Sequence, residues 1–327
     1  MKIIALVPVK NEAWILPTFL SSVKPISDKI IALDDNSTDE SKKILEQNNV
    51  LVLPFKQKQN IQSPMSERRK ILLEEGRKQK GTHFIWLDAD EAFTNPFIKN
   101  SKNIIQAMKP GQKLVMQWLA LWKNTSYYKN DSSVWSNNYK DFIFCDHPEY
   151  DFEQKFLSEA RTPESTIPSD NIKININQGA VLHFQFVFWQ GFQIKQAWYR
   201  CLELIKKPQN AFNINQTYKI TLDDKKTKLS KMPDNWVKGI KMPLSESKIK
   251  TLSLLKEISA RFNQYGILFF EPLQIWHVPE LYNEFVKIIG RKPRPILKPD
   301  LHIRVKTQIS KLIPRKIKNQ IKNLIQR

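Results

Sequence analysis

The feature that most constrains this fold is a regular alternation of strand-like and helix-like segments over roughly the first ninety residues. Apolar, β-rich runs alternate with amphipathic, helix-like stretches. The runs cover residues 3–9, 29–33, 50–53 and 83–87, and the helical stretches cover 12–23, the neighbourhood of Ile44 and Leu45, and 66–80. Such alternation predicts an α/β fold, in which a mostly parallel sheet is flanked by helices on both faces.

The pattern becomes mixed after residue 95. Helical spacing at 97–108 and 192–205 encloses apolar strand-like runs at 114–122, 141–145 and 180–184. Residues 208–290 are irregular with a few helical stretches. We therefore expect a first domain over residues 1–207, with halves 1–95 and 96–207. A mixed or helical C-terminal extension over 208–290 and a basic tail over 291–327 follow it.

Composition narrows the functional class. The 327 residues contain only 8 glycines, and neither a P-loop nor a G-x-G-x-x-G run occurs, which argues against the commonest NTPase and dinucleotide-binding classes. The two cysteines, Cys145 and Cys201, do not suggest a disulfide framework. A reducing cytoplasm fits such cysteine usage.

Charge is concentrated in the tail. The formal net charge is +20, and residues 290–327 contain twelve Lys or Arg against one acid, Asp300. Apolar residues from Val305 onward recur near the helical period, interrupted at Pro314. This pattern predicts a basic amphipathic helix, which either lies on an anionic membrane surface or packs its Ile/Leu face on the domain. No apolar run approaches the roughly 18–20 residues that a membrane span requires.

Three of the predicted strands end in polar residues. The first runs into Lys10-Asn11-Glu12, the second into Asp34-Asp35, and the fourth into Asp88-Ala89-Asp90. Ligands of open α/β sheets bind beyond the carboxyl ends of the strands. Two carboxylates separated by one residue can both reach a divalent ion, and Mg²⁺ or Mn²⁺ can neutralise a departing diphosphate.

Taken together, these segments resemble the family 2 glycosyltransferases, which have the GT-A fold, a Rossmann-like sheet. The resemblance spans roughly residues 1–95 and rests on Val7 to Glu12, Asp34 to Asp39, Ser66 to Arg69, and Phe84 to Asp90. It departs from the family at Lys10, where an aromatic residue is more usual, and at Lys70, where an Asn is more usual. It implies that residues 1–95 bind the nucleotide and 96–207 the acceptor. The implied nucleotide-sugar ligands are Pro8, Val9, Glu12, Asp35, Arg69, Asp88, Ala89 and Lys195.

A second resemblance, to a bacterial branch of the same family, lies downstream. It rests on Arg161-Thr162-Pro163, Val181 to Phe184, Trp189, Lys195 and Tyr199-Arg200. It implies that His183 joins Asp88 and Asp90 in binding Mn²⁺ or Mg²⁺, and that Lys195 meets phosphate. A neutral imidazole suits Mn²⁺. A histidine flanked by Leu and Phe also fits an ordinary buried core residue, so both interpretations stay open.

The residues that act on the acceptor are less well defined. An inverting transfer needs a base for the acceptor hydroxyl, and in this family the acid follows the D-x-D. Asp151 and Glu159 are the favoured candidates among the acids of residues 146–159. Tyr127, Tyr128 and Trp135 are candidates for stacking against an acceptor sugar, whereas Trp118 and Trp122 are expected in the core.

The sequence thus predicts a glycosyltransferase with a nucleotide-diphosphate sugar donor, UDP being the commonest choice in the family, and a glycan or lipid-linked glycan acceptor. We expect it in the cytoplasm, peripheral on the inner face of a membrane, without a nucleic-acid partner. Two alternatives are a basic nucleic-acid-binding protein and a nucleotidyltransferase of related architecture. The first lacks a recognised motif, and the second lacks its glycine-rich nucleotide loop.

Overall fold

The computed structural model describes residues 1–55, 65–131, 136, 138–152, 161–163, 170–222, 227–245 and 248–297. The chain forms two compact units. The first comprises Met1–Phe192 and Lys225–Ser253, and the second comprises Gln193–Asp224 and the chain from Leu254 onward. These units follow packing rather than chain order, so the division into ranges 1–207, 208–290 and 291–327 stays a prediction.

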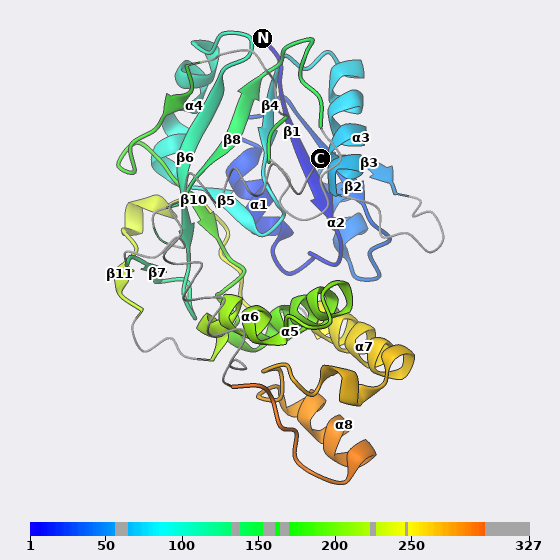
Figure 1. Cartoon of the computed structure of the whole chain (residues 1–327). Helices are drawn as coiled ribbons and strands as arrows, with labels where there is room; N and C mark the ends of the chain where they lie inside the picture. Colours follow the sequence, from blue (N-terminus) through cyan, green and yellow to red (C-terminus); the bar gives the residue numbers. More distant parts are fainter. Residues whose placement is uncertain are drawn as a thin grey trace, which may run out of the picture. The chain divides into compact units, whose positions relative to one another are not determined.

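The first unit is built on a sheet of nine strands within the described residues (Figure 1). The strands are β1 (Ile3–Val9), β2 (Lys29–Asp34), β3 (Leu51–Pro54), β4 (His83–Trp86), β5 (Glu91–Phe93), β6 (Lys113–Ala120), β8 (Tyr139–Cys145), β9 (Ile172–Lys173) and β10 (Val181–His183). Their order is β3-β2-β1-β4-β8-β6-β10-β5, with β9 also paired to β6. The expected α/β, Rossmann-like architecture is confirmed, with a mixed sheet.

Parallel pairing is confined to two parts of the sheet. Strands β3, β2, β1 and β4 are parallel neighbours, and β6 is parallel to β9 and β10. The antiparallel pairs are β4–β8, β6–β8 and β5–β10. Because β2, β1 and β4 run the same way, the polar residues after these three strands lie at one edge of the sheet.

Helices α1 (Leu16–Val23), α2 (Ser41–Gln47), α3 (Met65–Lys78) and α4 (Asn95–Gln106) belong to the same unit. Leu72 and Leu73 of α3 pack against Leu6, Phe84 and other apolar residues of the sheet. A second cluster joins Ile15 to Leu119, Leu182 and Trp236. A small separate sheet pairs β7 (Tyr127–Lys129) with β11 (Leu229–Lys231).

Two local expectations differ from the structure. The helix predicted from residue 12 begins at Leu16, because the backbone N–H groups of Glu12 and Ala13 bind side chains of the 37–41 segment instead. Residues Ser37 to Glu40 have the S-x-x-E spacing that is typical of a capping box, but α2 begins at Ser41 and its N-cap residue, Glu40, makes no side-chain cap hydrogen bond. Both differences arise because these polar residues join two neighbouring turns.

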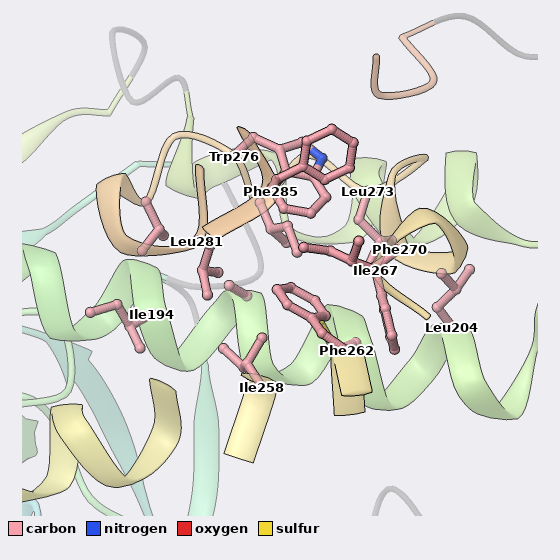
Figure 2. Packing of buried hydrophobic residues seen from close by; sticks show 14 of the residues in the cluster. Ile194, Leu204, Ile258, Phe262, Ile267, Phe270, Leu273, Trp276, Leu281 and Phe285 are labelled. Atoms are coloured by element: carbon pink, nitrogen blue, oxygen red, sulfur yellow. The ribbon is translucent and has the colours of Figure 1, made fainter. Parts of the chain in front are cut away.

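The second unit is helical in its described residues. It contains most of α5 (Trp189–Lys206), together with α6 (Ala211–Thr217), much of α7 (Lys248–Tyr265), and α8 (Pro279–Ile289). Figure 2 shows its apolar core, where Phe262 of α7 lies near Phe270, and Trp276 stacks edge-on against Phe285 of α8. Both ring pairs have centroids about 5 Å apart, the spacing of favourable aromatic contacts.

Among the described residues, no helix is long and apolar enough to cross a bilayer.

Candidate active site

The turn after β1 is bound to the turn after β2 by side-chain hydrogen bonds. Asn11 N donates to Ser37 Oγ at 2.9 Å, Glu12 N to Ser41 Oγ at 2.8 Å, Ala13 N to Asp39 Oδ2 at 3.1 Å, and Thr38 N to Asn11 Oδ1 at 2.7 Å. Asn11 and Asn36 have φ values of 55° and 54°, a region that Asn tolerates better than most residues. Polar residues of the 34–39 segment thus join the two turns. The Asp35 side chain takes no part in these hydrogen bonds.

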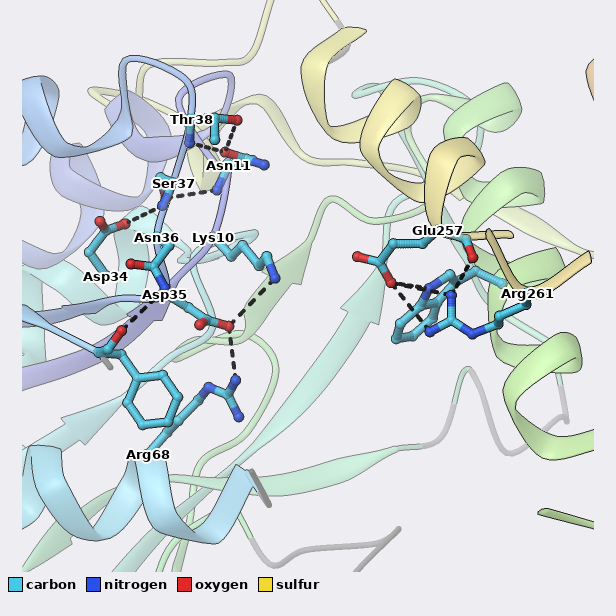
Figure 3. Close-up of polar contacts among 12 residues, drawn as sticks. Lys10, Asn11, Asp34, Asp35, Asn36, Ser37, Thr38, Arg68, Glu257 and Arg261 are labelled. Atoms are coloured by element: carbon cyan, nitrogen blue, oxygen red, sulfur yellow. Dashed lines mark hydrogen bonds and ion pairs between the residues drawn. The ribbon is translucent and has the colours of Figure 1, made fainter. Parts of the chain in front are cut away.

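Asp35 is the charged centre of the β2 end of the site. Figure 3 shows Lys10 and Arg68 directed at the Asp35 carboxylate; the Arg68 guanidinium lies 2.9 Å and the Lys10 ammonium 3.8 Å from Oδ2. Arg68 also lies over the ring of Phe55, 4.5 Å from its centroid. Within the described residues Asp35 Oδ1 is buried without a hydrogen-bond partner. A buried carboxylate oxygen of this kind can accept an N–H or O–H from a ligand.

The two acids of the D-x-D have different partners. Asp88 follows β4 and accepts from Arg161 at 3.2 Å, whereas Asp90 lies 3.5 Å from Nε2 of His183. The Asp88 side chain is 37% exposed and that of Asp90 only 9%. Burial acts to raise the pKa of Asp88, but the nearby Arg161 and Arg69 charges outweigh it, so that its pKa is lowered.

Aromatic and basic groups surround His183. Its ring stacks on Trp118 with centroids 4.2 Å apart, and Lys140 Nζ lies 3.7 Å from the Trp118 centroid. Burial lowers the pKa of Lys140. His183 Nδ1 is buried without a partner in the described part of the chain.

A third acid completes this end of the site. Glu91 begins β5, is fully buried, and binds Arg161 through both of its carboxylate oxygens, at 2.6 and 2.8 Å. Burial raises the pKa of Glu91, against the opposing charge of Arg161, and the close acids raise the pKa of Arg161. The β4 end therefore gathers three acids around one guanidinium and one imidazole.

Comparison with known proteins bears on the first part of the chain. Residues 4–141 match the model described as Glycosyl transferase family 2, a range that includes β1, β2, β4 and the D-x-D. These residues are therefore similar to a family 2 glycosyltransferase domain. The resemblance read from the four sequence segments is thereby confirmed, and of the three activities considered, glycosyl transfer is the one that the match supports.

Solved structures similar to this chain are distant. Residues 1–349 of TarS from S. aureus are 12% identical over 90% of this chain and 93% of that one, with a TM-score of 0.38. Glucosyl-3-phosphoglycerate synthase from Mycobacterium tuberculosis, in complex with Mn²⁺, UDP-glucose and phosphoglyceric acid, is 18% identical over 36% of this chain and 44% of that one, with a TM-score of 0.27. A mycobacterial protein is 18% identical over 38% of this chain and 42% of that one, with a TM-score of 0.29.

The chain thus spans less than half of the mycobacterial chains it matches. No curated protein sequence matches it. The family assignment therefore rests on the sequence match over residues 4–141.

Several other predicted ligands of the nucleotide sugar have partners in the structure. Val9 is buried at the end of β1 and its carbonyl accepts Asp35 N, while Pro8 precedes it in the same strand. Glu12 binds Lys250 Nζ and accepts Trp14 Nε1. Ala89 is buried between the two acids of the D-x-D.

The structure relates Arg69 to this edge of the sheet and leaves the predicted role of Lys195 untested. The Arg69 guanidinium lies 5.4 Å from the Trp86 ring and acts electrostatically on Asp88, which brings it to the β4 end. Lys195 belongs to the second unit, so its contact with phosphate stays a prediction.

The predicted catalytic bases are not tested by these contacts. Asp151 is exposed; it binds Lys70 Nζ at 3.3 Å and accepts Phe152 N. Glu159 lies outside the described residues. Asp146, at the other end of the same acidic range, forms a two-pronged ion pair with Arg77.

The structure describes four of the five aromatic residues that the sequence singled out. Trp118 and Trp122 are buried, as expected of core residues. Tyr128 packs near Trp236, whereas Tyr127 is 41% exposed and available for stacking. Trp135 lies outside the described residues.

Sequence reasoning missed three charged residues of the site. Arg68 was passed over for Arg69, Lys10 was noted only as a departure from the family, and Glu91 was not considered. Arg161 was noticed only within its Arg-Thr-Pro segment. One signal was available, since Glu91 follows the D-x-D directly in an otherwise apolar context.

Proposed function

We propose that this glycosyltransferase transfers a sugar from a nucleoside diphosphate sugar, with UDP the first nucleotide to test, to a hydroxyl of a glycan or lipid-linked glycan. The observation that carries the proposal is the family match over residues 4–141, which includes the ends of β2 and β4 with Asp35, Asp88 and Asp90. Asp35 and Asp88 follow strands separated by one other strand, which corresponds to about 10 Å. That separation suits a nucleoside bound across the sheet edge.

The nucleoside end of the donor fits the Asp35 region. Asp35 Oδ1 is a buried acceptor for a base N–H or a ribose hydroxyl. Arg68 and Lys10 hold the other oxygen, so the carboxylate is kept in one orientation. The adjacent backbone of Pro8 and Val9 would line the same end.

The residues around Asp90 fit a divalent ion. Asp90 Oδ2 and His183 Nε2 are 3.5 Å apart, close to the roughly 3 Å between neighbouring ligands of one Mg²⁺ or Mn²⁺. Within the described residues no group of three His, Cys, Asp or Glu side chains could hold a metal. Such an ion would therefore need phosphate oxygens to complete its shell, and Asp88 would contribute mainly by its charge.

The proposed chemistry follows from these positions. Asp90 and His183 would hold a Mn²⁺ or Mg²⁺ ion, which would supply neutralisation of the charge on the leaving diphosphate. The charges of Arg161 and Arg69 lower the pKa of Asp88 and so favour its charged form beside the sugar, and an acid takes the proton of the acceptor hydroxyl in an inverting displacement. Asp151 and Glu159 remain the two candidates for this base, and Asp151→Asn and Glu159→Gln would distinguish them by loss of kcat at unchanged donor affinity.

A panel of nucleotide sugars tests the proposal directly. Thermal unfolding is followed with each donor, with and without Mn²⁺, and repeated with Asp90→Asn. We expect one donor to raise Tm only when Mn²⁺ is present, and the variant to lose that effect while its own Tm stays near that of the native chain. A chelator should abolish turnover. Turnover that survives EDTA at full rate would exclude the metal, and binding of no nucleotide sugar would exclude the donor class.

The tail suggests a peripheral location on an anionic membrane surface. Residues 298–327 lie outside the described residues, so the proposal rests on the basic amphipathic pattern. The full chain should sediment with vesicles containing anionic lipid and stay in solution with neutral ones. Sedimentation with neither would remove the membrane role, and binding to DNA or RNA at physiological salt would restore the nucleic-acid alternative.

A further inference from the structure

Glu91 is a fully buried acid to which the proposed reaction assigns no role. It stands directly after the D-x-D, at the first position of β5, and lies opposite His183 in the antiparallel pairing of β5 with β10. A buried carboxylate is costly unless its oxygens are hydrogen-bonded. Its partners therefore indicate why this position holds a Glu.

Glu91 accepts four hydrogen bonds, two at each oxygen. Oε1 accepts Trp118 Nε1 at 2.7 Å and Arg161 NH2 at 2.8 Å, and Oε2 accepts Arg161 NH1 at 2.6 Å and the backbone N–H of Asp88 at 2.9 Å. The donors come from β6, from the 161–163 segment and from the residue that opens the D-x-D. All four are donors, which suits an acceptor-only carboxylate.

Each partner of Glu91 in turn contacts a residue of the proposed site. Arg161 NH2 also donates to Asp88 Oδ2 at 3.2 Å, so Glu91 fixes Asp88 through both its backbone and its side chain. Trp118, whose indole N–H is held by Glu91, stacks on the His183 ring at 4.2 Å and 26°. The orientations of Asp88 and His183 thus depend on one carboxylate.

We infer that Glu91 is a positioning residue of the transfer reaction, which orients Asp88 through Arg161 and His183 through Trp118. The inference rests on the proposed function, because it assigns the two oriented residues to the donor and the metal. Glu91 itself contacts neither, since its four hydrogen bonds already occupy its oxygens. Outer partners of metal ligands commonly change affinity or activity by about 10- to 100-fold when replaced.

Glu91→Gln is the principal test, because it keeps the size of the side chain but replaces one acceptor oxygen by a donor. We expect kcat to fall about 10- to 100-fold while the KM for the donor changes less than about threefold. Mn²⁺ affinity in the presence of UDP, measured by electron paramagnetic resonance of free Mn²⁺, should fall by a similar factor. This second measurement does not depend on turnover.

Asp146→Asn is a matched control. It breaks another two-pronged Arg–carboxylate pair of the first unit, with Arg77 at 2.8 and 2.9 Å, next to the amino end of β4. It should lower Tm without altering Mn²⁺ affinity or kcat. An equal loss of Mn²⁺ affinity in Asp146→Asn and Glu91→Gln would mean that Glu91 acts only through stability, and would overturn the inference.

Trp118→Phe keeps the test decisive if Glu91→Gln does not fold. It removes one N–H donor and retains an aromatic ring beside His183, so we expect a three- to tenfold loss of Mn²⁺ affinity and kcat. In a folded double variant, the two substitutions together should lower Mn²⁺ affinity and kcat little more than Glu91→Gln alone does, since they break one network. Native Mn²⁺ affinity and kcat in Trp118→Phe or in a folded Glu91→Gln would overturn the inference. Failure of the native chain to bind Mn²⁺ with UDP would instead overturn the proposed function.

Discussion

The β2 end and the β4 end of the site both present acids at one sheet edge, yet they differ in how many acids lie together. At the β2 end one acid, Asp35, meets two cations, Lys10 and Arg68. At the β4 end three acids surround one guanidinium, with His183 beside them. Arg69 also acts electrostatically on Asp88 there, so the two ends differ in how many acids they gather rather than in the sign of their charge.

The two ends are therefore suited to different tasks, nucleoside binding and cation binding, which the sequence alone does not distinguish. A carboxylate held by two cations has a fixed orientation and can receive hydrogen bonds from an uncharged nucleoside. Acids that lie together beside an imidazole suit a divalent cation instead. The comparison therefore predicts that substitutions at the β4 end act on turnover and metal, and those at the β2 end on nucleotide affinity.

The largest effect is expected at Asp90. Asp90→Asn removes the charge nearest His183, and the loss of roughly 4 kcal/mol of charge stabilisation corresponds to about a thousandfold lower kcat. Metal-free binding of UDP, measured by calorimetry, should stay within about twofold. Loss of that binding together with kcat would mean that the two ends do not act separately.

The next effect should appear at the β2 end. Asp35→Asn removes a charged acceptor, and the loss of one charged hydrogen bond, about 1.5–3 kcal/mol, lowers nucleotide affinity about 10- to 100-fold. Calorimetric titration with uridine isolates this contribution, because uridine has no phosphate to recruit a metal. Native uridine affinity in the variant would remove Asp35 from the nucleoside site.

Much of this arrangement follows from local sequence, and the remainder depends on distant partners. Apolar runs that end in acids were sufficient to predict β1, β2 and β4 and to place Asp35, Asp88 and Asp90 at their ends. Glu91 was missed because its role depends on Arg161, seventy residues away, and on Trp118. Sequence spacing does not reveal which side chains meet across a sheet.

The choice between Arg68 and Arg69 shows the same limit on a helix. Consecutive helical residues point about 100° apart, so the rotation of α3 on the sheet decides which guanidinium meets Asp35. In the structure Arg68 does so, while Arg69 lies near Trp86. The family resemblance gave a position in the chain, whereas tertiary packing decides the direction of each side chain.

A smaller effect should follow from Arg68→Met. The Arg68 side chain is only 12% exposed and lies 2.9 Å from Asp35, so its loss releases a carboxylate that is already buried. We expect uridine affinity to fall about fivefold, from roughly 1 kcal/mol of lost orientation. Arg69→Met, on the next residue of α3, is the matched control and should leave uridine affinity unchanged. A larger loss in Arg69→Met would assign the nucleoside contact to the other guanidinium.

The smallest effect is expected at Lys10, and it decides whether the positive charge of the β2 end matters beyond Arg68. The Lys10 side chain is 49% exposed and lies 3.8 Å from Asp35, the geometry of an ion pair worth about 0–1 kcal/mol. Lys10→Ala should therefore weaken uridine binding about twofold at low salt and not at all at high salt, since exposed charges are screened. In the Asp35→Asn background the same change should have no effect, because its partner charge is gone. A loss that persists at high salt or in that background would require Lys10 to contact the nucleotide itself.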